Sequence, residues 1–78
     1  MDVFEVTKRA ICKIQPGLEE SKIVPGALLK EDLDIDSLDM VELALALEDA
    51  TNLSLPEEDL DGIITVDDIV SLIESKER

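Results

Sequence analysis

The sequence has no histidine, tryptophan or tyrosine, and Phe4 is its only aromatic residue. Without histidine the chain lacks the usual base of a catalytic triad and an ordinary ligand for zinc or haem iron. We therefore expect neither catalysis by this chain alone nor a metal site. Because rings are almost absent, a hydrophobic core has to be built from Leu, Ile, Val and Ala.

Cysteine is also scarce, since Cys12 is the only one and cannot form an internal disulfide. No histidine is available to activate it, so a small core residue is a better interpretation than a nucleophile. The chain begins MDVFEV, with neither a basic segment nor a long apolar run. We therefore expect no secretion signal and no membrane insertion, and a cytoplasmic location.

Basic residues are few and unevenly placed, which gives a formal net charge of −13. No Lys or Arg occurs from Glu31 through Ser75, and this stretch holds fifteen of the twenty acidic residues. Such a balance argues against binding to nucleic acid or to anionic lipid. It predicts partners with basic docking patches, attracted over long range, although acidity could also serve solubility alone.

The length of 78 residues suits one domain, which we expect to span residues 1–78. Helical spacing of apolar residues predicts a first helix over residues 2–14, ended by Gln15-Pro16-Gly17. A second helix is expected from residue 36 or 37 to 50, a short third one after Pro56, and a last one capped by Thr65. The predicted fold is an all-α four-helix bundle with a long loop between the first two helices and a short third helix.

The long loop carries apolar residues that should attach it to the core, namely Leu28, Leu29, Leu33 and Ile35. About twenty residues without regular structure are unusual in a small domain unless the loop is functional. The loop leads directly into the second predicted helix, so a functional site is expected near that junction.

The start of the second helix is well marked, because Asp36 suits the N-cap and Asp39 completes a capping box. A helical wheel sorts the residues that follow into two opposite sectors. Leu38 and Leu45 fall at the border, so these two large apolar side chains should meet water. The apolar sector holds Met40, Val41, Leu43, Ala44 and Leu47, and the opposite sector holds Asp39, Glu42, Ala46 and Asp49.

Ser37 lies in the first turn of this helix, where unpaired N–H groups and the helix dipole favour a negative group on its oxygen. No His or Lys within the segment could activate the hydroxyl, and Asp36 is expected to act as the cap. Two interpretations stay open from spacing alone: Ser37 is an ordinary first-turn serine, or another enzyme modifies it.

The chain resembles the acyl carrier protein family in the segment Asp36-Ser37-Leu38-Asp39, followed by Val41-Glu42-Leu43 and Ala46-Leu47-Glu48-Asp49. Further matches cover nearly the whole chain, at Glu31-Asp32-Leu33, Leu55-Pro56-Glu57-Glu58 and Ile64-Thr65-Val66. The resemblance implies that Ser37 receives 4′-phosphopantetheine from coenzyme A through a Mg²⁺-dependent phosphopantetheinyl transferase. The thiol of this arm would then hold acyl intermediates as thioesters in fatty-acid or related lipid or polyketide biosynthesis.

The resemblance also implies which residues meet the partner enzymes, the transferase and acyl-transferring synthases. Acidic contacts would come from Asp36, Asp39, Glu42, Glu48 and Asp49, and apolar contacts from Leu38, Val41 and Leu45. For each acid alone, a solvated helix face is the simpler interpretation. Glu42 and Glu48 are expected to serve recognition without holding the fold, and the protein is expected to be a monomer.

Two positions depart from the fatty-acid carriers, which usually have Gly at the position of Asp34 and often Phe where this chain reads Ala50-Thr51. Gly often serves a special backbone angle, and Asp is among the few residues that tolerate one. The departures leave open a dedicated carrier for an aminoacyl or other specialised group. The Gly-Gly-x-Ser pattern of peptidyl carriers is absent.

Two alternative functions from other classes of protein stay open. Asp32-x-Asp34-x-Asp36 matches the opening of a calcium-binding EF-hand loop, but Ser37 replaces the turn glycine and Leu43 the closing glutamate. The other is an acidic interaction module that carries no cargo.

Overall fold

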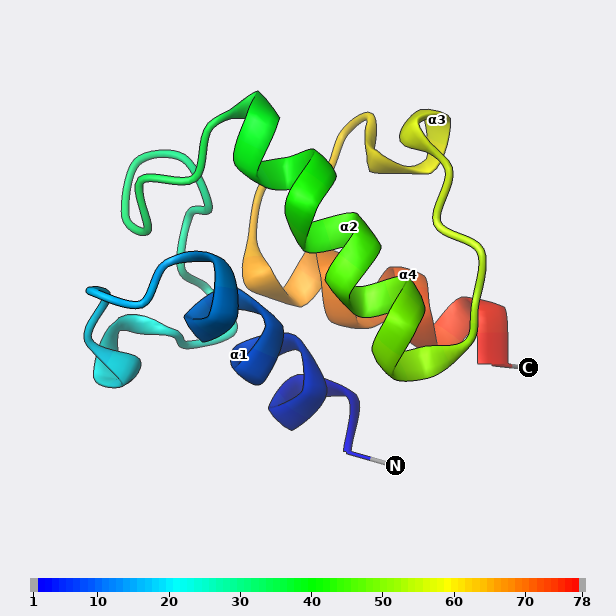
Figure 1. The fold of residues 1–78 in the computed structure, drawn as a ribbon, viewed down its shortest axis with the longest axis horizontal. Helices are drawn as coiled ribbons and strands as arrows, with labels where there is room; N and C mark the ends of the chain where they lie inside the picture. Colours follow the sequence, from blue (N-terminus) through cyan, green and yellow to red (C-terminus); the bar gives the residue numbers. More distant parts are fainter. Residues whose placement is uncertain (1, 78) are drawn as a thin grey trace.

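The computed structural model describes residues 2–77. Within that range it contains four α-helices, one 3₁₀ turn and no strand, so the predicted all-α fold is confirmed (Figure 1). An isolated antiparallel bridge joins Leu28 to Thr65. The elements are α1 (Val3–Ile14), η1 (Glu20–Lys22), α2 (Ser37–Thr51), α3 (Glu57–Leu60) and α4 (Val66–Glu77).

Three of the four helices, α1, α2 and α4, begin at side chains that accept hydrogen bonds from free backbone amides, whereas α3 follows Pro56 without a side-chain cap. The carboxylate of Asp2 accepts the amide of Glu5 at 3.3 Å, so α1 starts one residue after its cap. At α4 the predicted cap is confirmed, because the hydroxyl of Thr65 accepts the amide of Asp68 at 3.2 Å. The end of α2 lies one residue beyond the prediction, where Asn52 adopts a left-handed conformation with φ 59°.

The carboxylate of Asp68 forms the reciprocal half of the cap at the start of α4. It accepts the amides of Ile64 at 2.9 Å and of Thr65 at 3.0 Å. The Thr65 and Ile64 amides lower the pKa of Asp68 below its ordinary value of 3.8, since they favour the charged carboxylate.

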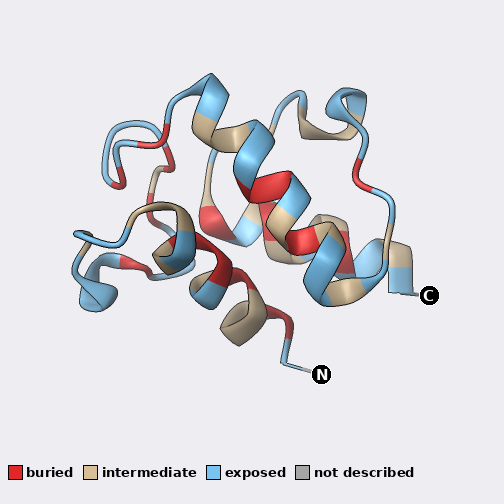
Figure 2. Ribbon diagram, in the orientation of Figure 1, coloured by how far each residue is buried: buried red, intermediate tan, exposed pale blue. Residues whose placement is uncertain are grey.

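The core is aliphatic, as the scarcity of rings predicted, and α1 packs against both α2 and α4. Figure 2 shows buried residues along these three helices and at separate points of the long connection. The only buried polar residue among those described is Thr7, whose hydroxyl donates to the carbonyl of Val3 at 2.8 Å. Cys12 is half-buried against the core, as expected of a small packing residue.

The connection between α1 and α2 is attached to the rest of the molecule, as predicted. Five of its side chains are buried: Leu29, Leu33 and Ile35, which were predicted, and Ile23 and Ala27, which were not. Leu28, the fourth predicted residue, is half-buried. Its backbone also bonds to the segment that precedes α4, with the amide of Leu29 donating to Ile64 at 2.9 Å and that of Val66 donating to Ala27 at 3.1 Å. These contacts therefore fix the position of the chain where it enters α2.

No helix within residues 2–77 combines the length and the apolar character that crossing a membrane would require.

Candidate functional site

Ser37 is the first residue of α2, and its side chain is exposed. The predicted capping box is present. The carboxylate of Asp36 accepts the amide of Asp39 at 2.8 Å, and the carboxylate of Asp39 accepts the amide of Asp36 at 3.3 Å. Asp36 is therefore engaged as a cap and is not a free base for the hydroxyl of Ser37. The start of α2 presents this hydroxyl beside the positive end of the helix dipole.

The turn before Ser37 depends on Asp34, whose backbone is left-handed with φ 57°. Asp34 thus has the kind of backbone angle that a glycine often serves at this position in the fatty-acid carriers. Asp is among the residues that adopt this region most readily after glycine.

Gln15, at the end of α1, fixes both sides of this turn. Its side-chain amide nitrogen donates to the carbonyl of Asp34 at 3.0 Å and to the carboxylate of Asp39 at 3.4 Å. This role of Gln15 was not predicted, because its partners lie 19 and 24 residues away and no local pattern marks them.

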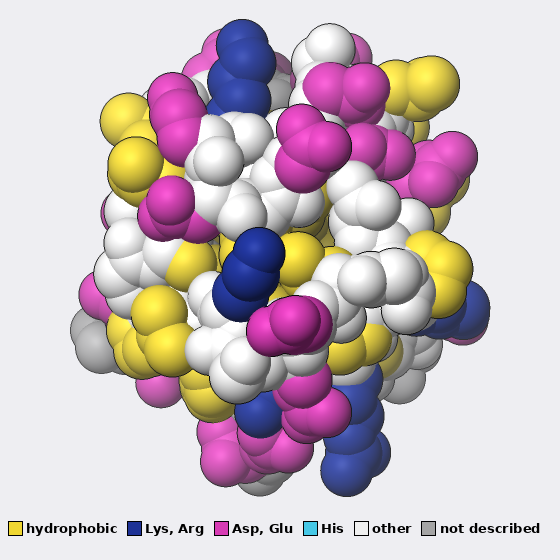
Figure 3. All heavy atoms as spheres, turned by 90° about the vertical axis from the view of Figure 1, so that its left-hand side faces the viewer, with side chains coloured by type: hydrophobic (Ala, Val, Ile, Leu, Met, Phe, Trp, Pro, Cys, Tyr) yellow, Lys and Arg dark blue, Asp and Glu magenta, His cyan; other side chains and the backbone are white. Residues whose placement is uncertain are grey.

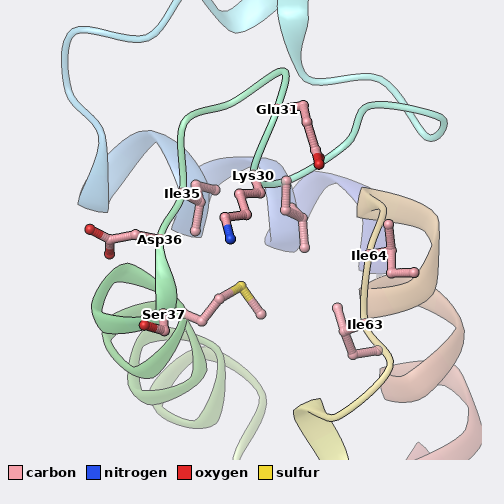
Figure 4. Close-up of a pocket in the computed structure, with 9 residues that line it drawn as sticks. Lys30, Glu31, Ile35, Asp36, Ser37, Ile63 and Ile64 are labelled. Carbon is pink, nitrogen blue, oxygen red and sulfur yellow. The ribbon is translucent and has the colours of Figure 1, made fainter.

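A cavity of about 450 Å³ opens beside Ser37 (Figure 4). Its walls come from the end of the long connection, the first turn of α2 and the segment before α4. The apolar walls are Leu29, Ile35, Met40, Ile63 and Ile64, and the polar residues are Lys30, Glu31, Asp36 and Ser37. Figure 4 shows the ammonium of Lys30 pointing into this space and the carboxylate of Asp36 turned away from it. Lys30, Ile63 and the cavity were not predicted from the sequence.

The residue types fit a phosphodiester arm attached at Ser37. The hydroxyl is exposed at a helix start, which favours an anionic group. The cavity adjoining it offers apolar walls to the group that the arm would carry. Asp36, the nearest carboxylate in sequence, is bound to a backbone amide and faces away from the cavity.

The apolar residues predicted to meet partners are all exposed, Leu38 by 70%, Val41 by 46% and Leu45 by 60%. This confirms the expectation for Leu38 and Leu45. The placement of Val41 within the apolar sector was wrong as a guide to burial. The buried stripe of α2 is narrower, consisting of Leu43, Ala44 and Leu47, because only that side faces α1 and the α4 side chains Ile69 and Leu72.

The acidic residues of α2 fall into two groups. Glu42 and Asp49 are exposed, whereas Asp39 and Glu48 are half-buried. The carboxylate of Glu48 accepts the amide of Leu55 at 2.7 Å and so holds the connection between α2 and α3. The expectation that Glu48 does not hold the fold was therefore wrong.

Ala46 also differs from the prediction. The wheel placed it on the polar side of α2, but it is half-buried and shares a groove with Val6 and Ala10 of α1. The close approach of α1 covers part of its surface.

Figure 3 shows carboxylates spread over one face of the molecule, with isolated Lys or Arg side chains and patches of hydrophobic surface among them. This mixture is compatible with basic partners that also make apolar contacts.

The calcium-loop interpretation is wrong. Residues 37–43, which would form its second half, are the first two turns of α2. The carboxylate of Asp32 accepts the amide of Leu28 at 2.8 Å, and Asp36 is held in the capping box. Among residues 2–77 no three Asp, Glu or Cys side chains gather closely enough to hold a metal ion.

A family model described as a phosphopantetheine attachment site matches residues 9–73. The match runs from the middle of α1 through the long connection, α2 and α3 into α4. Ser37 and the cavity beside it lie inside the matched region.

Proposed function

Since the chain belongs to the phosphopantetheine attachment family, which includes the acyl carrier proteins, we propose that Ser37 is the residue that receives the arm. The family fixes the cofactor as covalently attached 4′-phosphopantetheine. It does not by itself choose among the serines of this chain.

The position of Ser37 at the start of α2 is the observation that carries this proposal. The other serines lie in the short turn η1 (Ser21), in the loop after α2 (Ser54) and within or near the end of α4 (Ser71 and Ser75). Only Ser37 combines an exposed hydroxyl with the first turn of a long helix and with an adjoining cavity.

The attachment needs an enzyme other than this chain. A bond forms between the Ser37 oxygen and the phosphorus of the arm, the pyrophosphate bond of coenzyme A breaks, and 3′,5′-ADP leaves. The hydroxyl proton has to pass to a base of the transferase, since the chain has no histidine and Asp36 is engaged as a cap. Holding the serine at a rigid helix start and leaving it accessible are the contributions of this chain.

The finer proposal is a non-catalytic carrier that holds acyl intermediates as thioesters in fatty-acid or related lipid or polyketide biosynthesis. Its partners are the phosphopantetheinyl transferase and acyl-transferring synthases with basic docking patches, and it acts as a cytoplasmic, single-domain monomer. The apolar walls of the cavity support an acyl cargo. The alternative is a dedicated carrier for an aminoacyl or other specialised acyl group.

The proposal is tested by incubating the apo protein with a broad-specificity transferase and coenzyme A. We expect one arm per chain by mass spectrometry, and none on the Ser37→Ala variant. Ser71→Ala, which removes another exposed serine, is the matched control and should be modified like the wild type. An arm on Ser37→Ala would assign the site to another residue.

A further inference from the structure

We propose that Lys30 makes the cavity beside Ser37 a binding site for an acyl group that ends in a carboxylate. This inference rests on the proposed attachment at Ser37 and specifies the class of cargo: a short dicarboxylic acyl group rather than a plain alkyl one.

Lys30 is the last cation before the acidic stretch, and its side chain points into the cavity (Figure 4). Two ion pairs join residues within the range 2–77, Lys8 with Glu20 at 3.2 Å and Lys76 with Asp59 at 2.7 Å. Neither includes Lys30. Its ammonium therefore has no carboxylate partner within ion-pair distance among the described residues.

The two carboxylates that line the cavity do not occupy this ammonium. Asp36 is turned away from the cavity and accepts the amide of Asp39. Glu31 lies beyond 4.0 Å of the ammonium, since no ion pair joins the two, and Figure 4 shows its carboxylate at the edge of the site. An incoming carboxylate would thus not have to displace a protein carboxylate from the ammonium.

The other walls determine what the rest of the cargo must be. Leu29, Ile35, Met40 and Ile63 offer only hydrocarbon and a thioether, so the cargo should be apolar between its thioester and its far end. A plain alkyl chain would cover these walls but would leave the ammonium without an anionic partner. Lys30 is an exposed residue at the rim of the cavity, where a terminal carboxylate would supply its ammonium with the missing partner.

The direction of the change in stability distinguishes attraction by Lys30 from repulsion by the net charge of the whole protein. The chain carries a formal net charge of −13, so one further negative charge should on average destabilise the folded protein. A stabilising carboxylate consequently requires a cation close to it.

The experiment compares holo protein loaded with adipoyl or hexanoyl groups, which have the same number of carbons and differ in the terminal carboxylate. The variants are wild type, Lys30→Met, and Lys13→Met as a control that removes an exposed cation of α1. We expect adipoyl to raise the melting temperature above that of the hexanoyl form by about 2–5 °C in the wild type and in Lys13→Met. In Lys30→Met the order should reverse. An equal difference in all three proteins would overturn the proposal.

A second measurement does not depend on the melting of the variants. The ¹³C resonance of a labelled adipoyl carboxylate should titrate at lower pH in the wild type than in Lys30→Met. Equal titration midpoints would also reject the role of Lys30. Failure of loading in the wild type would instead contradict attachment at Ser37, so mass spectrometry of each loaded form distinguishes the two proposals.

Discussion

At the scale of single residues, Asp34 shows how one backbone angle sets the entry into α2. Its φ of 57° costs a residue with a Cβ atom about 1–2 kcal/mol, and Asp less than most. Glycine removes that cost but loses about 0.5–1 kcal/mol of backbone entropy on folding. We therefore expect Asp34→Gly to leave the free energy of unfolding within about 0.5 kcal/mol of the wild type.

In a urea-unfolding series, the stability of other variants at this position should follow the cost of the left-handed backbone angle for each residue type. Asp34→Ala should lower the free energy of unfolding by about 1 kcal/mol, and the β-branched Asp34→Val by more. The lost carboxylate contributes little because it is exposed. Equal stability of the Ala and Asp proteins would show that the left-handed angle is not the reason for Asp here.

Local residues of the site could be predicted from the sequence, and distant ones could not. The capping box of Asp36 and Asp39 depends on a spacing of three residues, and the tolerance of Asp34 is a property of its residue type. The contacts of Gln15 link positions 19 and 24 residues apart, and the cavity at Lys30 joins three separate segments. Such contacts follow from how the helices pack and have no signal in the local sequence.

At the scale of elements, the exposed side of α2 is predicted to select partners. Glu42 and Asp49 are the best pair for testing this role, because both are exposed. Glu48 is less suitable, since its carboxylate accepts the amide of Leu55 and holds the fold. Glu42→Lys with Asp49→Lys should change the free energy of unfolding by about 0.5 kcal/mol or less per site. Transfer of the arm by a basic transferase should become several-fold slower at low salt, because steering attraction is lost.

The control keeps the change in net charge and moves it to another helix. Glu74→Lys with Glu77→Lys alters two exposed acids of α4 and should leave transfer faster than the α2 variant does. The gap between the two variants should narrow as ionic strength rises, because charges are screened over about 10 Å at 0.1 M salt. Equal rates for both variants would reduce the effect to net charge and remove the role of α2.

The helical wheel of α2 succeeded where periodicity decides exposure and failed where a neighbouring helix does. Leu38 and Leu45 are exposed as their border positions predicted. Val41 is exposed because only a narrow stripe of α2 faces α1 and the side chains of α4, and Ala46 is half-buried because α1 lies close to it. A wheel describes one helix, so it contains no information on the width of the contact with the next one.

At the scale of the whole molecule, self-repulsion should limit stability at neutral pH. Fifteen acids lie in a stretch without a Lys or Arg, and the ion pairs within residues 2–77 relieve few of them. We expect the melting temperature at pH 7.5 to rise by several degrees when salt increases from about 0.01 to 0.15 M, since the Debye length falls from about 30 to 8 Å. Millimolar Mg²⁺ should act in the same direction. A melting temperature that does not respond to either would contradict this prediction.

Mild acid should stabilise the protein for the same reason, but Asp68 limits the gain. Its pKa is lowered in the folded state by the amides of Thr65 and Ile64. A lowered folded pKa means that its contribution is present above the ordinary value of 3.8 and is lost as pH falls through the lower folded value. The melting temperature should thus rise from pH 7.5 to about 5 and fall again in stronger acid.

The Asp68→Ala variant isolates the contribution of this carboxylate. Its melting temperature should lie below that of the wild type by a constant amount from pH 7.5 to 5, and the gap should shrink once the pH drops below 3.8. A gap that persists unchanged in strong acid would mean that the charged carboxylate of Asp68 does not hold the start of α4.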